Sequence, residues 1–288
     1  MRSVLLAGTL AAFAALSAPA PALAAPPASP PAASAPGAAD WRTPDPNDVL
    51  VIDTNKGRIF VELVPEVAPQ FAARVRELAH AHFYDGLTFF RVIDEFMAQT
   101  GDPLNNGQGG SDKPDVPAEF SFRRGPGGPF VSAHDKGSTE IGFVKSMPVT
   151  SQSIMLAAMT RDGMVQAWPL YCPGVAGAAR AEDPNSANSQ FFLMRAKYPR
   201  LEKNYTAFGR VIAGQDVVNA IKTGEPVADP QDRMERVRLL ADLPPAERPT
   251  IKVIDPNGPW FKAELARVRA REGAGFSACD VNIPSEVR

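Results

Sequence analysis

Short apolar segments alternate with turn residues over most of the chain, and this pattern predicts a mainly β protein. Residues 49–53 and 58–63 read as two strands joined by a turn, in which Gly57 supplies the conformational freedom that a tight turn needs. Further short apolar runs, each bounded by Gly, Pro or Asn, lie at 87–92, 190–194, 207–212 and 237–241. Such spacing favours a closed or sandwiched antiparallel sheet over alternating βαβ units.

Other segments have helical periodicity. Between Pro65 and His82, apolar residues recur at three- and four-residue spacings, which predicts an amphipathic helix covering an edge or mouth of the sheet. Residues 217–222 predict a brief second helix after Gly214. Near the C-terminal end, we expect a strand over 251–254 and a charged helix over about 261–271.

The first 48 residues differ in kind from the rest. Residues 1–24 combine an early Arg2, a short apolar run and an Ala-Leu-Ala cleavage site, which predicts a signal peptide. The alternative is retention as a membrane anchor, but Pro19 and Pro21 interrupt the run before it reaches the ~20 apolar residues of a membrane span. Residues 25–48 are rich in Pro and Ala and are expected to form an extended linker. We therefore expect a periplasmic or secreted protein without a membrane span in its mature form.

Charge and composition exclude several classes of function. A formal net charge of -2 and a pI near 6.0 give no concentrated positive charge for nucleic acid or an anionic membrane. The three histidines lack ligand-like spacing, and neither G-x-S-x-G nor H-E-x-x-H occurs, so no metal, cofactor or hydrolase chemistry is expected. Cys172 and Cys279 are the only cysteines, and an exported chain favours a disulfide between them over two free buried thiols.

Two sequence blocks point to a specific chemistry. Residues 89–102 read FFRVIDEFMAQTGD, and residues 185–193 read NSANSQFFL. Together they resemble the two signature stretches of the cyclophilins. Shorter matches follow in family order at 54–63, 83–86, 105–110, 207–210 and 214–218. The resemblance covers roughly residues 49–125 and 173–243.

The resemblance implies a fold and a function. The expected fold is a closed eight-stranded antiparallel β-barrel capped by two helices, formed by residues 49–243 with an insertion at about 126–172, and followed by a C-terminal extension at 244–288. The expected activity is cis/trans isomerisation of X-Pro bonds in exported proteins during folding, without a covalent intermediate. Proline-containing polypeptides are the expected partners of a monomeric enzyme.

This chemistry explains why an arginine is needed. Rotation about an X-Pro bond is opposed by a barrier of about 18–20 kcal/mol, which comes from amide resonance. A guanidinium that donates to the prolyl nitrogen competes for the lone pair used in that resonance, mainly in the twisted transition state. The resemblance assigns this catalytic role to Arg91, and it assigns Gln99 to holding the substrate and orienting the arginine.

The remaining site residues are also assigned by resemblance. The apolar pocket for the proline ring is expected to comprise Phe96, Met97, Phe192 and Leu201, with Tyr205 on its wall. A second binding glutamine is Gln190, the backbone of Ala179 and Arg180 pairs with the bound peptide, and Gly107 allows close approach. Tyr205 stands where the family usually has His, and Arg200 stands where cyclosporin-sensitive members usually have Trp, so strong cyclosporin binding is not expected.

A second class of function remains open from the sequence. The chain could be a proline-binding or chaperone module with little isomerase activity, whose partner contacts the insertion or the C-terminal extension. Trp168 and Tyr171 in the insertion are candidates for such a contact surface, although a single Trp is more often buried support.

Overall fold

The computed structural model describes residues 35–288, so the predicted signal peptide and residues 25–34 of the predicted linker lie outside the described residues. Three α-helices are present in this part of the chain: α1 (Pro69–His80), α2 (Gln215–Ala220) and α3 (Pro259–Glu272). None of the helices in residues 35–288 combines the length and apolar character needed to cross a bilayer.

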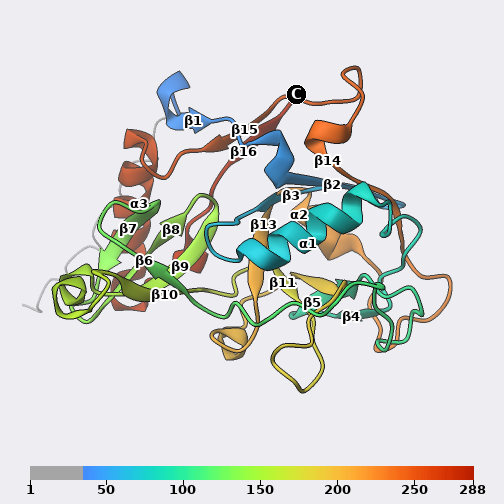
Figure 1. Ribbon diagram of the computed structural model, residues 1–288. Coiled ribbons are helices and arrows are strands. Elements are labelled where there is room, and N and C mark those ends of the chain that lie inside the picture. The colour runs from blue at the N-terminus through green and yellow to red at the C-terminus, as the bar shows by residue number, and fades with distance from the viewer. Residues whose placement is uncertain (1–34) are drawn as a thin grey trace, which may run out of the picture. The chain divides into compact units, whose positions relative to one another are not determined.

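The largest sheet is mainly antiparallel and has eight strands (Figure 1). In spatial order they are β14 (Met234–Leu239), β2 (Val49–Thr54), β3 (Gly57–Leu63), β13 (Ala207–Ala213), β11 (Val175–Ala178), β12 (Phe191–Met194), β5 (Met97–Thr100) and β4 (Arg91–Ile93). The predicted hairpin at residues 49–63 is confirmed as β2 and β3. At its turn, the Thr54 hydroxyl donates to the carbonyl of Gly57 at 2.7 Å, and Gly57 has a φ of 137°, a conformation that favours glycine.

The sheet is a curled half-barrel, and the predicted closed barrel is not found. The strand ladder ends at β14 on one edge and at β4 on the other. The two edges are connected by isolated bridges, Thr88 with Arg233 and Val92 with Gly224, and by a few backbone hydrogen bonds around them. The segment between these bridges contains Pro226 and Pro230, which have no N–H group to donate to a ladder. The edges are therefore joined by a loop rather than by strand pairing.

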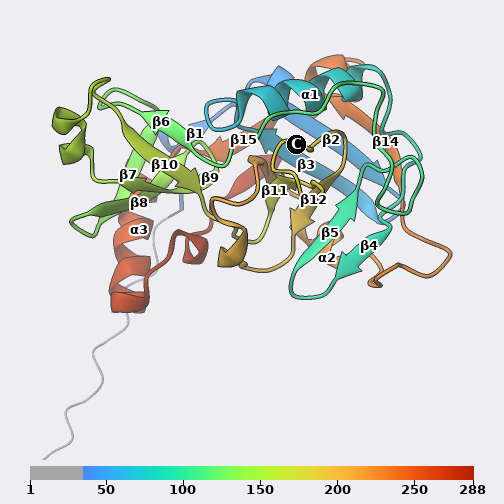
Figure 2. The ribbon, with the colours of Figure 1, turned by 60° about the horizontal axis from the view of Figure 1, so that its bottom comes forward.

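Helix α1 covers one face of the large sheet (Figure 2). Its buried residues, among them Phe71, Val75 and Leu78, belong to the same apolar cluster as Leu50 and Phe208 of the sheet. The helix begins four residues later than predicted, with proline at its first position. The Glu119 carboxylate accepts the backbone N–H groups of Gln70 at 3.0 Å and Phe71 at 2.9 Å, so a distant loop satisfies the helix start.

The insertion and the strand that precedes it build a second sheet of five antiparallel strands. In spatial order these are β6 (Phe122–Arg124), β10 (Val165–Pro169), β9 (Met147–Gln152), β8 (Thr139–Val144) and β7 (Phe130–Asp135). The C-terminal extension supplies α3 and two strands of a third sheet, whose order is β1 (Trp41–Arg42), β15 (Ile251–Ile254) and β16 (Ser285–Val287). Phe143 of β8 meets Phe261 of α3 edge to face, with 5.2 Å between ring centroids. Insertion and extension thus share one apolar cluster.

Residues 38–48 do not behave as the extended linker that their composition predicts. Trp41 and Arg42 pair with Ile254 and Val253 of the C-terminal extension. The Asp40 carboxylate is buried and accepts the backbone N–H of Trp260 at 2.9 Å, at the start of α3. The composition of this segment could not predict the pairing, because the partner strand lies more than 200 residues away in the sequence.

A disulfide joins Cys172 to Cys279, which are separated by 107 residues. Cys172 lies between β10 and β11, and Cys279 lies in the C-terminal extension. The bond therefore connects the extension covalently to the segment that leads into the large sheet.

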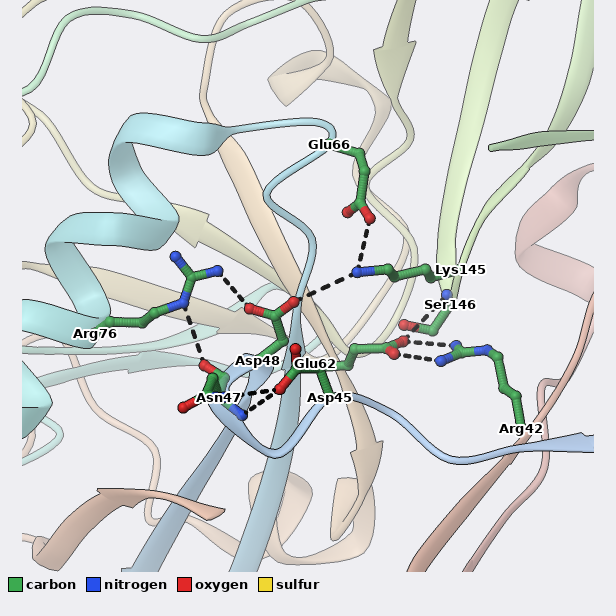
Figure 3. A network of polar contacts seen from close by, with 9 residues as sticks. All are labelled: Arg42, Asp45, Asn47, Asp48, Glu62, Glu66, Arg76, Lys145 and Ser146. Atoms are coloured by element: carbon green, nitrogen blue, oxygen red, sulfur yellow. Dashed lines mark hydrogen bonds and ion pairs between the residues drawn. The ribbon is translucent and has the colours of Figure 1, made fainter. Parts of the chain in front are cut away.

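A network of ion pairs also attaches the insertion and the N-terminal segment to the large sheet (Figure 3). Lys145, at the β8–β9 turn, contacts Glu66 at 2.8 Å and Asp48 at 3.5 Å. Arg42 donates two hydrogen bonds to the Glu62 carboxylate, at 2.5 and 2.8 Å, and only 1% of the Glu62 side chain is exposed. Burial acts to raise the pKa of Glu62, but the hydrogen bonds and charge of Arg42 outweigh it and hold that pKa below its ordinary value of 4.5.

We predict that Glu62→Gln lowers the free energy of unfolding by about 3 kcal/mol at neutral pH, because the partly buried Arg42 loses its counter-charge. A carboxyl whose pKa is depressed by folding contributes stability that is lost as the pH falls through that pKa. The difference in the free energy of unfolding between wild type and Glu62→Gln should therefore become smaller under acidic conditions. Urea unfolding at several pH values measures this, with the exposed Glu235→Gln as control. A loss no larger than that of the control, or one independent of pH, would contradict the prediction.

Candidate active site

Strand register places the predicted catalytic residues in one row. Arg91 of β4 pairs with Gln99 of β5, Gln99 pairs with Phe192 of β12, and Phe192 pairs with Gly177 of β11. Residues directly opposite each other on neighbouring strands project to the same face of a sheet. The guanidinium, the carboxamide and the aromatic ring therefore lie side by side on one face of the sheet.

Hydrogen bonds orient the Arg91 side chain. One terminal nitrogen donates to Oε1 of Gln99 at 3.3 Å, Nε2 of Gln99 donates to Oε1 of Gln190 at 3.0 Å, and Nε2 of Gln190 donates to the carbonyl of Gly109 at 2.8 Å. The Nε of Arg91 donates to Oε1 of Glu225 at 2.6 Å. The guanidinium is thus held from two sides while about a third of the side chain, 35%, remains exposed.

The five residues predicted to form the apolar pocket lie in one cluster. Met97, Phe192 and Leu201 are buried within it, and Phe96 and Tyr205 are partly buried against it. The rings of Phe192 and Tyr205 meet edge to face with 6.1 Å between centroids. An apolar surface of this kind suits a pyrrolidine ring, which carries no hydrogen-bonding group.

Tyr171 packs against the residues predicted to form this pocket. Its ring stacks on Phe192 with 6.1 Å between centroids, and a Cβ added at Gly177 would lie 2.4 Å from the Phe192 ring and 3.0 Å from the Tyr171 ring. Glycine at this position therefore allows both rings to lie against the strand. Burial, with smaller contributions from Tyr205 and Glu202, raises the pKa of Tyr171 well above its ordinary value.

A polar groove of about 450 Å³ lies next to Gln99. Its lining includes all of the remaining residues predicted to hold the peptide: Gly107, Ala179, Arg180 and Gln190. The Arg180 side chain turns back onto the protein, where its guanidinium lies 4.5 Å from the centre of the Tyr205 ring and donates to the carbonyl of Ala181 at 2.7 Å. Arg180 therefore connects the groove to the wall of the apolar pocket.

Two residues of the site were not predicted from the sequence. The Asp102 carboxylate accepts the backbone N–H groups of Leu104 at 2.7 Å, Asn106 at 2.9 Å and Gly107 at 2.5 Å, which fixes the loop that lines the groove. Burial acts to raise the pKa of Asp102, but these donors lower it below its ordinary value. An aspartate followed by Pro, Asn and Gly residues is a turn signal that could have identified this role. The other residue, Glu225, gives no such signal.

Comparisons with known proteins agree with this geometry. Residues 49–240 match the family model described as cyclophilin type peptidyl-prolyl cis-trans isomerase/CLD. A probable peptidyl-prolyl cis-trans isomerase of Brucella suis is 33% identical over 191 residues, which cover 62% of this chain and 74% of that protein. Peptidyl-prolyl cis-trans isomerase 10 of Caenorhabditis elegans is 30% identical over 174 residues, which cover 60% of this chain and 81% of that protein.

A solved structure extends the similarity beyond the matched domain. The crystal structure of cyclophilin AquaCyp293 from Hirschia baltica superposes with a TM-score of 0.79 at 34% identity, covering 86% of this chain and 93% of that one. This share is larger than residues 49–240 account for, so the similarity reaches into the segments outside the family match. The fold is that of a cyclophilin. The chain belongs to the cyclophilin-type peptidyl-prolyl cis-trans isomerases, which confirms the family predicted from its signature blocks.

We predict that Asp102→Asn weakens substrate binding more than turnover. The amide places an NH₂ group where a carboxylate oxygen now accepts backbone N–H groups, so the loop at 104–109 should loosen. We expect KM to rise about fivefold with a smaller change in kcat, and faster hydrogen exchange of the loop amides. The exposed Asp112→Asn in the neighbouring segment is the control. Unchanged exchange at 104–109 would show that Asp102 does not hold the loop.

Proposed function

We propose that Arg91 is the catalytic group of this isomerase, acting on proline-containing polypeptides. The observation that carries the proposal is the position of its guanidinium. It is fixed by Gln99 and Glu225 and lies in the same strand row as Phe192 of the apolar cluster.

The proposed reaction needs only positioned groups. The proline ring enters the apolar pocket at Phe96, Met97 and Phe192, and the peptide backbone follows the polar groove. The guanidinium then donates to the prolyl nitrogen as that nitrogen becomes pyramidal. The hydrogen bond is strongest in the twisted state, so it stabilises the transition state more than either planar isomer. No covalent bond forms or breaks, so a rigidly held donor is the main requirement.

The test of this role is Arg91→Ala, for which we expect kcat/KM on Xaa-Pro peptides to fall by about a hundredfold, the order of magnitude found when a transition-state donor is removed. NMR exchange spectroscopy measures the rate without a coupling protease. Arg123→Ala, which removes an exposed arginine of β6 in the five-stranded sheet, is the control and should keep the wild-type rate. Equal turnover by wild type and Arg91→Ala would reject the assignment and favour a binding module without catalysis.

We further propose that the protein works as a monomer outside the cytoplasm, in the periplasm or after secretion, and assists the folding of exported proteins. Two features support this proposal. The leader pattern at residues 1–24 is that of a signal peptide, and the Cys172–Cys279 disulfide is of the kind that persists in oxidising compartments. Prolyl isomerisation is slow relative to most folding steps, so newly exported chains would be the natural clients.

Export gives a measurable outcome. When the full chain is expressed in a bacterial host, we expect release by osmotic shock, a mature N-terminus at Ala25 and no thiol that reacts with an alkylating reagent under denaturing conditions. Mass spectrometry reads both the N-terminus and the alkylation. Retention of residues 1–24 on a protein in the cytoplasmic fraction would contradict the proposal.

A further inference from the structure

Glu225 lies next to Arg91, beyond the edge of the sheet, and so extends the row formed by Phe192, Gln99 and Arg91. The loop that carries it is held against β4, because Val92 and Gly224 exchange backbone hydrogen bonds of 2.8 Å in both directions and Val227 donates to Phe90 at 2.9 Å. In an antiparallel bridge between Val92 and Gly224, the residue opposite Arg91 is Glu225. The carboxylate is therefore placed beside the guanidinium by the backbone and not by a flexible side chain alone.

The Glu225 carboxylate combines a contact to Arg91 with access to solvent. Its Oε1 accepts from Nε of Arg91 at 2.6 Å, yet 57% of its side chain is exposed. Two other charged side chains near this edge have partners of their own. Nζ of Lys222 donates to carbonyls of its own loop, the nearest being that of Ala228 at 2.6 Å, and Asp94 pairs with Arg195 at 3.1 Å. A ligand near Arg91 therefore meets a negative group at the rim.

We propose that Glu225 sets the charge preference of the isomerase site, so that it favours substrates with Lys or Arg beside the prolyl segment and disfavours those with Asp or Glu. This inference rests on the proposed catalytic role of Arg91. A peptide with its proline ring over Phe192 has one flank at the polar groove beside Gln99. Arg91 and Glu225 continue the same row on the far side of Gln99 from Phe192, so a side chain close to the proline can reach the Glu225 carboxylate.

The physical reason is competition for one guanidinium. Without a carboxylate beside it, Arg91 would attract acidic side chains, and an acidic side chain bound there would draw the guanidinium away from the prolyl nitrogen. Glu225 already occupies the Nε side of Arg91, so it repels a second carboxylate while a basic side chain is attracted to it. The preference should therefore change sign when the charge of Glu225 is removed.

The test compares three peptides that differ only in having Lys, Gln or Glu at one position near the proline. Each of the two positions on either side of the proline is varied in turn. The measured quantity is the ratio of kcat/KM for the Lys peptide to that for the Glu peptide, obtained by NMR exchange. This ratio is independent of any loss of overall rate in a variant.

The variants are Glu225→Gln, which keeps an amide oxygen near Arg91, and Glu225→Lys. The control is Glu286→Gln, which breaks an ion pair of the same 2.6 Å length at the C-terminal strand.

For wild type we expect the Lys peptide to be preferred about threefold at one or more positions in low salt, which is the scale of a partly exposed charge pair. In Glu225→Gln the ratio should fall at least fivefold below the wild-type value, and in Glu225→Lys it should fall further. Raising NaCl to about 0.5 M should bring all ratios toward one. Glu286→Gln should keep the wild-type ratio.

Two results would overturn the proposal. One is a Lys-to-Glu ratio that is the same in wild type and Glu225→Gln at every position, while both proteins isomerise the uncharged Gln peptide. The other is a change of equal size in Glu286→Gln. Failure of the catalytic assignment looks different, because Arg91→Ala would then turn over the uncharged peptide as fast as wild type.

Discussion

The lateral register of β4, β5 and β12 is the constraint on which the active site depends. A shift of one residue in any of these strands would exchange its two faces and send Arg91, Gln99 or Phe192 to the wrong side. Burial on both faces prevents such a shift. Val92, Ala98, Phe191 and Leu193 alternate with the row residues and lie in the cluster beneath α1, whereas Met97, Phe192 and Met194 lie in the other cluster. The core thus determines where the guanidinium lies.

The second cluster has contributors far outside the sheet that bears the site. Met97, Phe192 and Leu201 share it with Phe143 of the insertion and with Phe261, Val268 and Phe276 of the C-terminal extension. The residues predicted to bind the proline ring therefore share their packing with segments that the cyclophilin signature does not include. Their buried contacts, together with the Arg42–Glu62 and Lys145–Asp48 pairs, make them structural parts of the described protein and not loose appendages.

Local signals predicted much of the fold and most of the site. The β2–β3 hairpin and the apolar face of α1 follow from strand and helix periodicity, and the two signature blocks brought together Arg91, Gln99, Gln190 and Phe192. Interactions between distant segments were not predictable in this way. Arg91 and Glu225 are 134 residues apart, and β1 pairs with a strand from the other end of the chain. The open edge of the half-barrel was also missed, because closure of the eight-stranded barrel was taken from the family resemblance and not from a local sequence signal.

The disulfide closes residues 172–279 into a single covalent ring, which contains four of the eight strands of the large sheet and most of the C-terminal extension. Cys172 directly follows Tyr171, whose ring lies against Phe192. A protease that cuts the backbone once at any site within this ring produces two fragments that stay attached to each other. After a single cut in this ring, the fragment that carries Tyr171 and the fragment that carries Phe192 therefore stay linked.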